Sequence, residues 1–183
     1  MPFLLVQSLA FRVRDRFTAT LRAKRAAACL LWMSAQPRTT IERAVIQFDG
    51  ARTAAGPIQA VASRTCDVLP VVARTAEILH SGTDLTKQTA ALLVCLEIGL
   101  PKELAPLALA AGRALNRGEY LRLLTAGLGT PEAVRDAHDE VLAQVLGSAK
   151  RVQQLRRDVD AYVEREADKA TLAALIAEVD AAA

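Results

Sequence analysis

Glycine and proline divide this chain into segments of helical length, and their spacing limits the fold more than any other feature of the sequence. Ala and Leu dominate the segments between these breaks, and runs of β-branched residues are short. No segment alternates apolar and polar residues in the way a half-buried strand does. The sequence therefore predicts an all-α protein, a helical bundle built from helices that end at glycines and prolines.

The expected helices follow from these breaks and from residues typical of helix starts. Thr39 and Glu42 have the spacing of a capping box, Pro57 suits a first helical position, and Thr130 followed by Pro131 is a strong start signal. The predicted helices are one or two over 3–34, then 40–48, 57–79, 84–99, 101–112, 119–126, helices over 131–146, and 149–179. We expect three parts, namely a helical domain over 1–99, a hairpin module over 100–147 and a C-terminal helix over 148–183; the resemblance described below implies that the first is ratchet-like.

The segment 57–79 predicts a long amphipathic helix. At 100° per residue, one side is expected to face the core: Ile58, Val61, Thr65, Leu69, Val72, Ala76 and Leu79. The opposite side is polar: Gln59, Ser63, Asp67, Pro70, Arg74 and Glu77. Arg64 lies on a flank. Pro70 falls inside the helix, where it removes one backbone hydrogen bond, so we expect a bend there.

Composition excludes several classes of protein. The chain has 183 residues, of which 52% are apolar and 23% charged, so global disorder is excluded. Its longest apolar runs are much shorter than the roughly 20 residues that span a bilayer. No basic segment precedes the apolar start, so a secretory signal is not expected. Three unclustered cysteines fit a reducing compartment, and we expect a cytoplasmic protein.

The net charge of +3 hides an uneven distribution. Residues 1–48 carry eight basic and two acidic side chains (+6), residues 49–128 carry eight and seven (+1), and residues 129–183 carry seven and eleven (−4). A basic start and an acidic end suggest that a polyanion binds on one side. An uneven but merely solvated surface is the alternative interpretation.

The motifs of common catalytic sites are missing. The sequence has no glycine-rich phosphate loop with a following Lys-Ser or Lys-Thr, no Gly-x-Ser-x-Gly turn, and no Cys or His pair at metal-ligand spacing. Cys29, Cys66 and Cys95 lie among apolar neighbours, which favours buried structural thiols. His138 stands among acidic residues, a pattern equally typical of a surface helix. We therefore expect no enzyme activity, metal or cofactor in this chain on its own.

The segment from Leu104 to Gly127 reads as helix, tight turn and helix. The turn would place backbone N–H groups and two arginines at the start of the second helix, where a phosphate binds well. Asn116 is expected to adopt a left-handed conformation in this turn. The pattern is that of a helix-hairpin-helix module, which binds the nucleic-acid backbone without reading sequence; a plain helical hairpin is the alternative. The phosphate-binding candidates are Arg113, Asn116, Arg117 and Gly118.

Several segments in this order resemble a known family. They are Cys29-Leu30-Leu31-Trp32-Met33, Thr40-Ile41-Glu42-Arg43, Gly56-Pro57-Ile58, the Arg74–Leu79 segment, and Ala126-Gly127-Leu128. Together they resemble the helical region behind the motor of Ski-like superfamily-two helicases, DEAD/DEAH-box enzymes that include archaeal Hel-type repair helicases. The resemblance covers about residues 25–147. It implies that 57–79 is a ratchet helix along a single strand and that 104–127 is the family's helix-hairpin-helix.

This sequence also departs from the family. The two RecA-like motor domains are absent, so the resemblance implies no ATP hydrolysis or unwinding by this chain alone. Gln59 and Asp67 stand where archaeal relatives offer an Arg and a Trp, and Asn116 stands at the hairpin's usual Gly. The candidates for contact with the strand are Gln59, Ser63, Arg64 and Arg74.

The main hypothesis is a non-catalytic nucleic-acid-binding module, either a fragment or a split subunit of a helicase. Its expected partners are single-stranded or forked DNA, with RNA left open, and a separate helicase motor chain that this polypeptide would complete. No membrane partner is expected. The alternative is a helical protein–protein interaction module without nucleic-acid binding, for which the basic N-terminal segment would be a docking surface.

Overall fold

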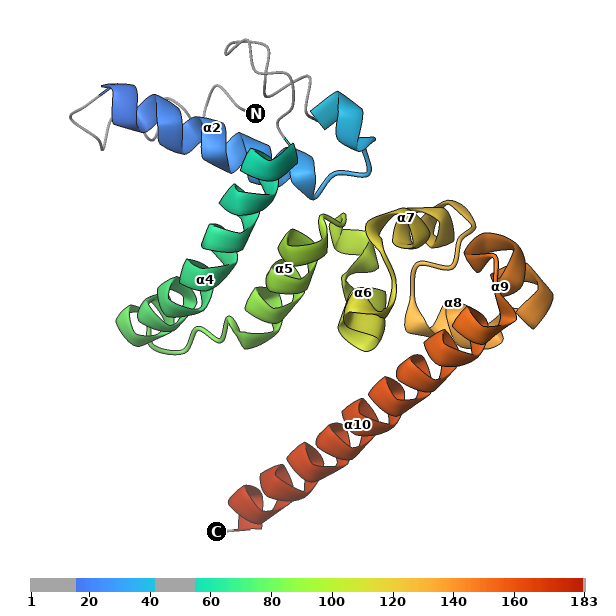
Figure 1. Cartoon of the computed structure of the whole chain (residues 1–183). Helices are drawn as coiled ribbons and strands as arrows, with labels where there is room; N and C mark the ends of the chain where they lie inside the picture. The colour runs from blue at the N-terminus through green and yellow to red at the C-terminus, as the bar shows by residue number, and fades with distance from the viewer. Residues whose placement is uncertain (1–15, 42–54, 183) are drawn as a thin grey trace. The chain divides into compact units, whose positions relative to one another are not determined.

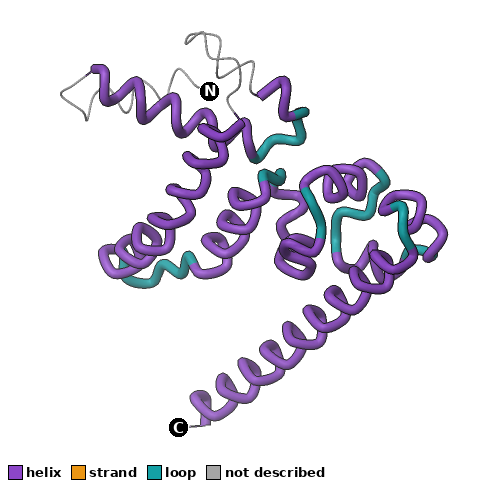
Figure 2. Tube along the Cα trace, viewed as in Figure 1, coloured by secondary structure: helices purple, strands orange, loops and turns teal. Residues whose placement is uncertain are grey.

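The computed structural model describes residues 16–41 and 55–182, and every regular element among them is a helix (Figure 1, Figure 2). The predicted all-α class is therefore confirmed. In the described part of the chain, no helix combines the length and the apolar character that crossing a membrane requires.

The chain divides into two compact units, residues 1–102 and residues 103–183. The first boundary predicted from the sequence, after residue 99, lies close to this division. The hairpin module and the C-terminal helix, which we expected as separate parts, fall within the second unit. The reason is that the long C-terminal helix packs against the helices that precede it.

The long helices in the described part of the first unit are α2 (Arg16–Trp32), α4 (Ala55–Leu79) and α5 (Thr86–Ile98). Helix α4 packs against both α2 and α5. The ends predicted near Ser34, at Leu79 and at Gly99 agree closely with these bounds. Helix α5 begins slightly later than expected, because Leu85 occupies the N-cap position while the Asp84 carboxylate accepts a hydrogen bond from the Thr86 N–H at 2.9 Å.

The helix that we expected to begin at Thr40 begins at Arg38. The Pro37 carbonyl accepts hydrogen bonds from the N–H groups of Thr40 and Ile41, at 3.0 and 3.2 Å. Thr39 thus lies within the helix, and its assignment as the N-cap is wrong. Its proposed partner Glu42, the expected loop before Ala55 and the helix expected before Arg16 lie outside the described residues.

The core of the first unit forms around Trp32, which is 5% exposed. Its indole N–H donates a hydrogen bond to the Leu96 carbonyl oxygen at 2.8 Å, so the ring is fixed against the end of α5. Gly99 ends that helix with φ +82°, and its N–H and that of Leu100 both donate to the Cys95 carbonyl. The core residues around the indole are Ile41, Ile58, Ala62 and Leu96.

The buried face of α4 differs from the predicted one. Ile58 and Ala62 are buried, as the contacts with α2 and α5 require, but Val72 is 55% exposed and Leu79 is 72% exposed. The expectation that these two side chains face the core is wrong. Helix α4 carries apolar residues on more than one side, and its neighbours cover only one of them.

The second unit consists of short helices followed by one long helix. They are η1 (Lys102–Leu104), α6 (Ala105–Ala111), η2 (Gly112–Ala114), α7 (Arg117–Thr125), α8 (Pro131–Asp136), α9 (Asp139–Leu146) and α10 (Ala149–Ala182). Thr130 caps α8 as predicted, accepting from the Ala133 N–H at 3.2 Å. The region 131–146 holds two helices, and Gly147 separates the second from α10 with φ +73°.

Only the first half of α10 is packed. Val152, Leu155 and Val159 are buried where α10 contacts α6, α8 and α9. Arg156 donates to the carbonyls of Val134, Arg135 and Ala137 and forms an ion pair with Asp139. Because these carbonyls belong to the end of α8, the guanidinium satisfies acceptors that the helix itself leaves open. From residue 164 to residue 179, every described side chain of α10 is exposed.

Gly99→Ala is expected to destabilise the first unit by about 2–4 kcal/mol. The left-handed backbone at this position disfavours a side chain, and the added methyl group would overpack the core. An added Cβ would lie 2.7 Å from Trp32 Cζ2. Urea unfolding followed by the fluorescence of Trp32, the one tryptophan in the sequence, measures the loss in this unit.

Gly82→Ala is the matched control. Gly82 has φ +88° but no atom within 4 Å of an added Cβ, so only the backbone strain of about 1 kcal/mol remains. Equal losses in the two variants would contradict the role assigned to the Trp32–Gly99 contact.

Candidate nucleic-acid interface

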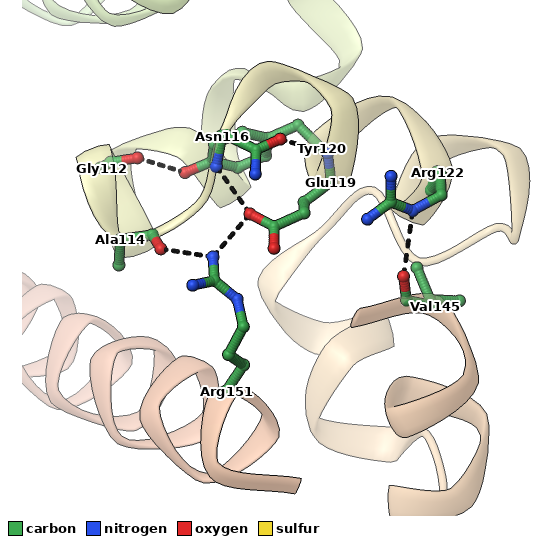
Figure 3. A network of polar contacts seen from close by, with 8 residues as sticks. All are labelled: Gly112, Ala114, Asn116, Glu119, Tyr120, Arg122, Val145 and Arg151. Carbon is green, nitrogen blue, oxygen red and sulfur yellow. Dashed lines mark hydrogen bonds and ion pairs between the residues drawn. The ribbon is translucent and has the colours of Figure 1, made fainter. Parts of the chain in front are cut away.

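The connection between α6 and α7 is closed by a capping box at Asn116 and Glu119 (Figure 3). The Asn116 Oδ1 accepts from the Glu119 N–H at 3.1 Å, and the Glu119 Oε2 accepts from the Asn116 N–H at 2.8 Å. Asn116 has φ −85° and ψ 163°. The left-handed conformation expected for it is therefore wrong, since an N-cap that accepts in this way requires extended backbone.

The same carboxylate binds the long C-terminal helix to this connection. Glu119 is 5% exposed, and its Oε2 lies 2.6 Å from Nη2 of Arg151. The Nη2 group also donates to the Ala114 carbonyl at 3.0 Å. Arg151, at the start of α10, thus compensates a buried negative charge and fixes the turn that precedes α7 (Figure 3).

Two further hydrogen bonds hold α7 in place (Figure 3). The Tyr120 hydroxyl donates to the Gly112 carbonyl at 2.7 Å, and the Arg122 Nε donates to the Val145 carbonyl at 3.0 Å. Burial raises the pKa of Tyr120, with smaller contributions from the charges of Asp158 and Glu119. The phenol therefore remains protonated, and so a donor, at neutral and moderately alkaline pH.

The hairpin candidates lie on the outer side of this fixed turn. Arg113, Asn116 and Gly118 are exposed, and Arg117 is partly exposed. Arg113 and Arg117 bring two positive charges to this turn, in addition to the ion pair of Arg151 with Glu119. This charge adds to the positive end of the α7 dipole, so the turn favours an anion electrostatically.

Helix α6 packs mainly against α10, and α7 contacts α9. The two helices of the predicted hairpin are thus each supported by another part of the second unit. The helix-hairpin-helix assignment stays a prediction.

The candidates on α4 form a separate exposed strip in the first unit. Gln59, Ser63, Arg64 and Arg74 are all exposed, as is Pro70 between them. The Arg74 Nη1 lies 3.1 Å from the Glu77 Oε2, so its charge is largely balanced. Arg64 is accordingly the better cation on this helix for attracting a phosphate.

The structure also exposes apolar side chains, including Val72 and Leu79, which the sequence predicted to face the core. The α4 stripe consists of Val68, Val71, Val72, Ile78 and Leu79, which are 55–72% exposed. The α10 stripe consists of Leu172, Leu175, Ile176 and Val179, which are 54–68% exposed. Their spacing of three and four residues was visible in the sequence, but such spacing is equally typical of a helix face that is buried.

The described cysteines and histidines can be placed individually. No group of three His, Cys, Asp or Glu residues within 16–41 and 55–182 is placed to hold a metal ion. Cys29 and Cys66 are half-buried and Cys95 is buried, all as free thiols. Burial raises the pKa of Cys66, and the charges of Glu97 and Asp67 raise it further, which keeps this thiol protonated. His138 is exposed at the N-cap of α9.

Comparisons of the chain with protein-family models, with curated proteins and with solved structures found no match to any of them.

Arg151→Ala is expected to destabilise the second unit by about 2 kcal/mol, because it leaves the Glu119 carboxylate buried without its cation. The double variant Arg151→Ala/Glu119→Gln is expected to recover part of this loss, since a neutral amide is less costly to bury. Urea unfolding followed by circular dichroism at the helical band measures both effects.

Arg135→Ala serves as the control, because the Arg135–Asp160 pair is about half exposed on both sides. Loss of such a pair costs roughly 0.5 kcal/mol or less. If Arg135→Ala destabilises the protein as much as Arg151→Ala, the central role of the buried pair is contradicted.

Proposed function

We propose that this chain is a non-catalytic helical module that binds nucleic acid, resembling the C-terminal part of a DEAD/DEAH-box helicase. The observation that supports this most is the exposed turn before α7, where Arg113 and Arg117 flank a helix start. Glu119, Arg151 and Tyr120 hold that turn from inside. A rigid, positively charged helix start is a suitable site for phosphate oxygens.

The proposed binding is to the backbone of the strand. Arg113 and Arg117 would supply charge and Gly118 would allow close approach of a phosphate, while Asn116 keeps the turn in its capped conformation. Aromatic residues make up 4% of the sequence, and Tyr120 and Trp32 are buried, so base stacking contributes little. Affinity should then be modest, independent of base sequence and strongly dependent on salt.

The exposed strip of α4 would provide a second contact along a single strand. Gln59 and Ser63 can donate hydrogen bonds to phosphate or sugar oxygens, and Arg64 adds a charge. Arg74 would contribute less, since Glu77 competes for its guanidinium. Single-stranded or forked DNA, with RNA as the other candidate, would be the ligand. A separate helicase motor chain would supply ATP hydrolysis.

A protein–protein interaction module is the second candidate function. It is supported by the α4 and α10 stripes, because exposed apolar patches of this kind mark docking surfaces in many proteins. The two functions are compatible, since the stripes and the nucleic-acid candidates occupy different side chains.

Arg113→Ala/Arg117→Ala is expected to weaken binding to labelled single-stranded DNA by about tenfold in low salt, and to reduce the salt slope by about 1.4, as the loss of two phosphate contacts implies. Fluorescence anisotropy at several salt concentrations measures both quantities.

Arg157→Ala/Arg165→Ala removes the same charge from α10 and is the matched control. Both arginines are exposed and donate only to carbonyls of their own helix, those of Gln153 and Ala161. Affinity should change by less than about twofold in this control. An equal loss in both double variants would show that only net charge matters, and no loss in either would contradict the site in the α7 turn.

A further inference from the structure

We propose that the α4 stripe and the α10 stripe are the two halves of one interface, through which two copies of the chain associate. In this dimer, the outer half of α10 of each copy covers the α4 stripe of the other. The proposal goes beyond the proposed function and does not rest on nucleic-acid binding.

The exposed apolar surface is concentrated on these two stripes. Among the described residues, every large aliphatic side chain that is more than half exposed lies on one of these two stripes, apart from Leu30. An isolated exposed leucine is ordinary, but contiguous apolar patches are uncommon on proteins that remain monomers. Two such patches therefore point to a shared cover.

The two stripes have matching residue spacing. Val68, Val71 and Val72 follow each other with the same steps as Leu172, Leu175 and Ile176. Steps of three and four residues let two helices interlock side chains along a common seam. The aliphatic residues on both sides are of similar size, which suits such packing.

The outer part of α10 and the helix beside α4 carry opposite charges. Residues 164–182, the outer part of α10, carry five acidic and two basic side chains, for a charge of −3. Helix α2, which packs against α4, carries four basic side chains and no acidic one. Arg64 precedes the α4 stripe by one turn and is exposed. Helix α4 itself is neutral, with two basic and two acidic side chains, so the positive charge that favours the acidic part of α10 comes from α2, whereas two copies of α10 would repel each other.

The apolar area of the stripes is large enough for a dimer only if both copies contribute both stripes. At roughly 60–80 Å² of apolar surface for each half-exposed Val, Leu or Ile, one pair of stripes buries on the order of 600 Å². That is less than stable interfaces bury. In a reciprocal exchange, where α10 of each copy covers α4 of the other, the buried area doubles to about 1,200 Å², the lower end of the range for stable protein–protein interfaces. Reciprocal exchange also closes the assembly with twofold symmetry and leaves no stripe exposed.

The dimer would leave most of the nucleic-acid candidates accessible, and the exception is Arg64, which lies one turn before Val68 on the same side of α4. Gln59 and Ser63 lie on a different side of α4 from Val68 and Val72, since Ser63 and Val68, five residues apart, differ by about 140° around the helix. Arg74 lies about one turn from Val71 and Ile78, at the edge of the α4 stripe. The hairpin residues belong to α7 and its preceding turn, which neither stripe includes. Binding and dimer formation can therefore be measured separately.

Sedimentation velocity of the full chain without nucleic acid, from low to high micromolar concentration, tests the proposal. The wild type is expected to dimerise, and Leu172→Glu/Ile176→Glu should raise the dissociation constant on the order of 100-fold by placing charges in the seam. Ala170→Glu/Ala174→Glu adds the same charges to the other side of α10, where both alanines are exposed, and should retain the dimer. Circular dichroism checks that each variant remains helical.

The second pair of variants distinguishes this arrangement from others. Val68→Glu/Val72→Glu should abolish the dimer as fully as the α10 variant does, and mixing the two variants should restore partial association, since one intact stripe pair remains in the mixed dimer. A monomeric wild type, as would result if α10 covered α4 of the same chain, overturns the proposal. A dimer that only the α10 substitutions disrupt would overturn it as well.

Discussion

The second unit depends on the interactions of one buried group, the Glu119 carboxylate. It accepts from the Asn116 N–H to start α7, and it pairs with Arg151 at the start of α10. A carboxylate that is 5% exposed is costly to bury alone, so the start of α7 and the start of α10 must form together. Arg156, one and a half turns further along α10, satisfies the end of α8 in the same manner.

The proposed nucleic-acid site depends on the same buried contacts. Arg113 and Arg117 lie on a short turn whose backbone would otherwise be free to change, and phosphate binding requires preorganised donors. The buried hydrogen bonds of Glu119, Tyr120 and Arg151 provide that order from the inner side. The residues that hold the turn are therefore different from the residues that would touch a phosphate.

Helix α4 shows how one helix can serve several surfaces. Its contacts with α2 and α5 use the side that includes Ile58 and Ala62. The strip with Gln59, Ser63 and Arg74 is polar and exposed, and the α4 stripe is apolar and exposed. Because an α-helix presents its residues around a full turn, three different surfaces fit on 25 residues without conflict.

Much of the secondary structure followed from the sequence. The helix ends at Leu79, Gly99 and Gly147 and the cap at Thr130 depend on local backbone preferences that Gly, Pro and Thr carry with them. The spacing of Asn116 and Glu119 also matches a capping box, although a left-handed turn at Asn116 was the prediction. The start at Arg38 was missed because Pro37 supplies the cap through its carbonyl, which no side-chain pattern reveals.

The sequence by itself determined that the chain is helical and where most helices stop, since those preferences act over a few neighbouring residues. Only the tertiary structure decided which side of α4 is buried, so that Val72 and Leu79 became surface residues. It also decided that Arg151 compensates Glu119 across 32 positions in the chain. Burial and ion pairing depend on which helices meet in space, and helical periodicity cannot specify that when a helix has apolar residues on more than one side.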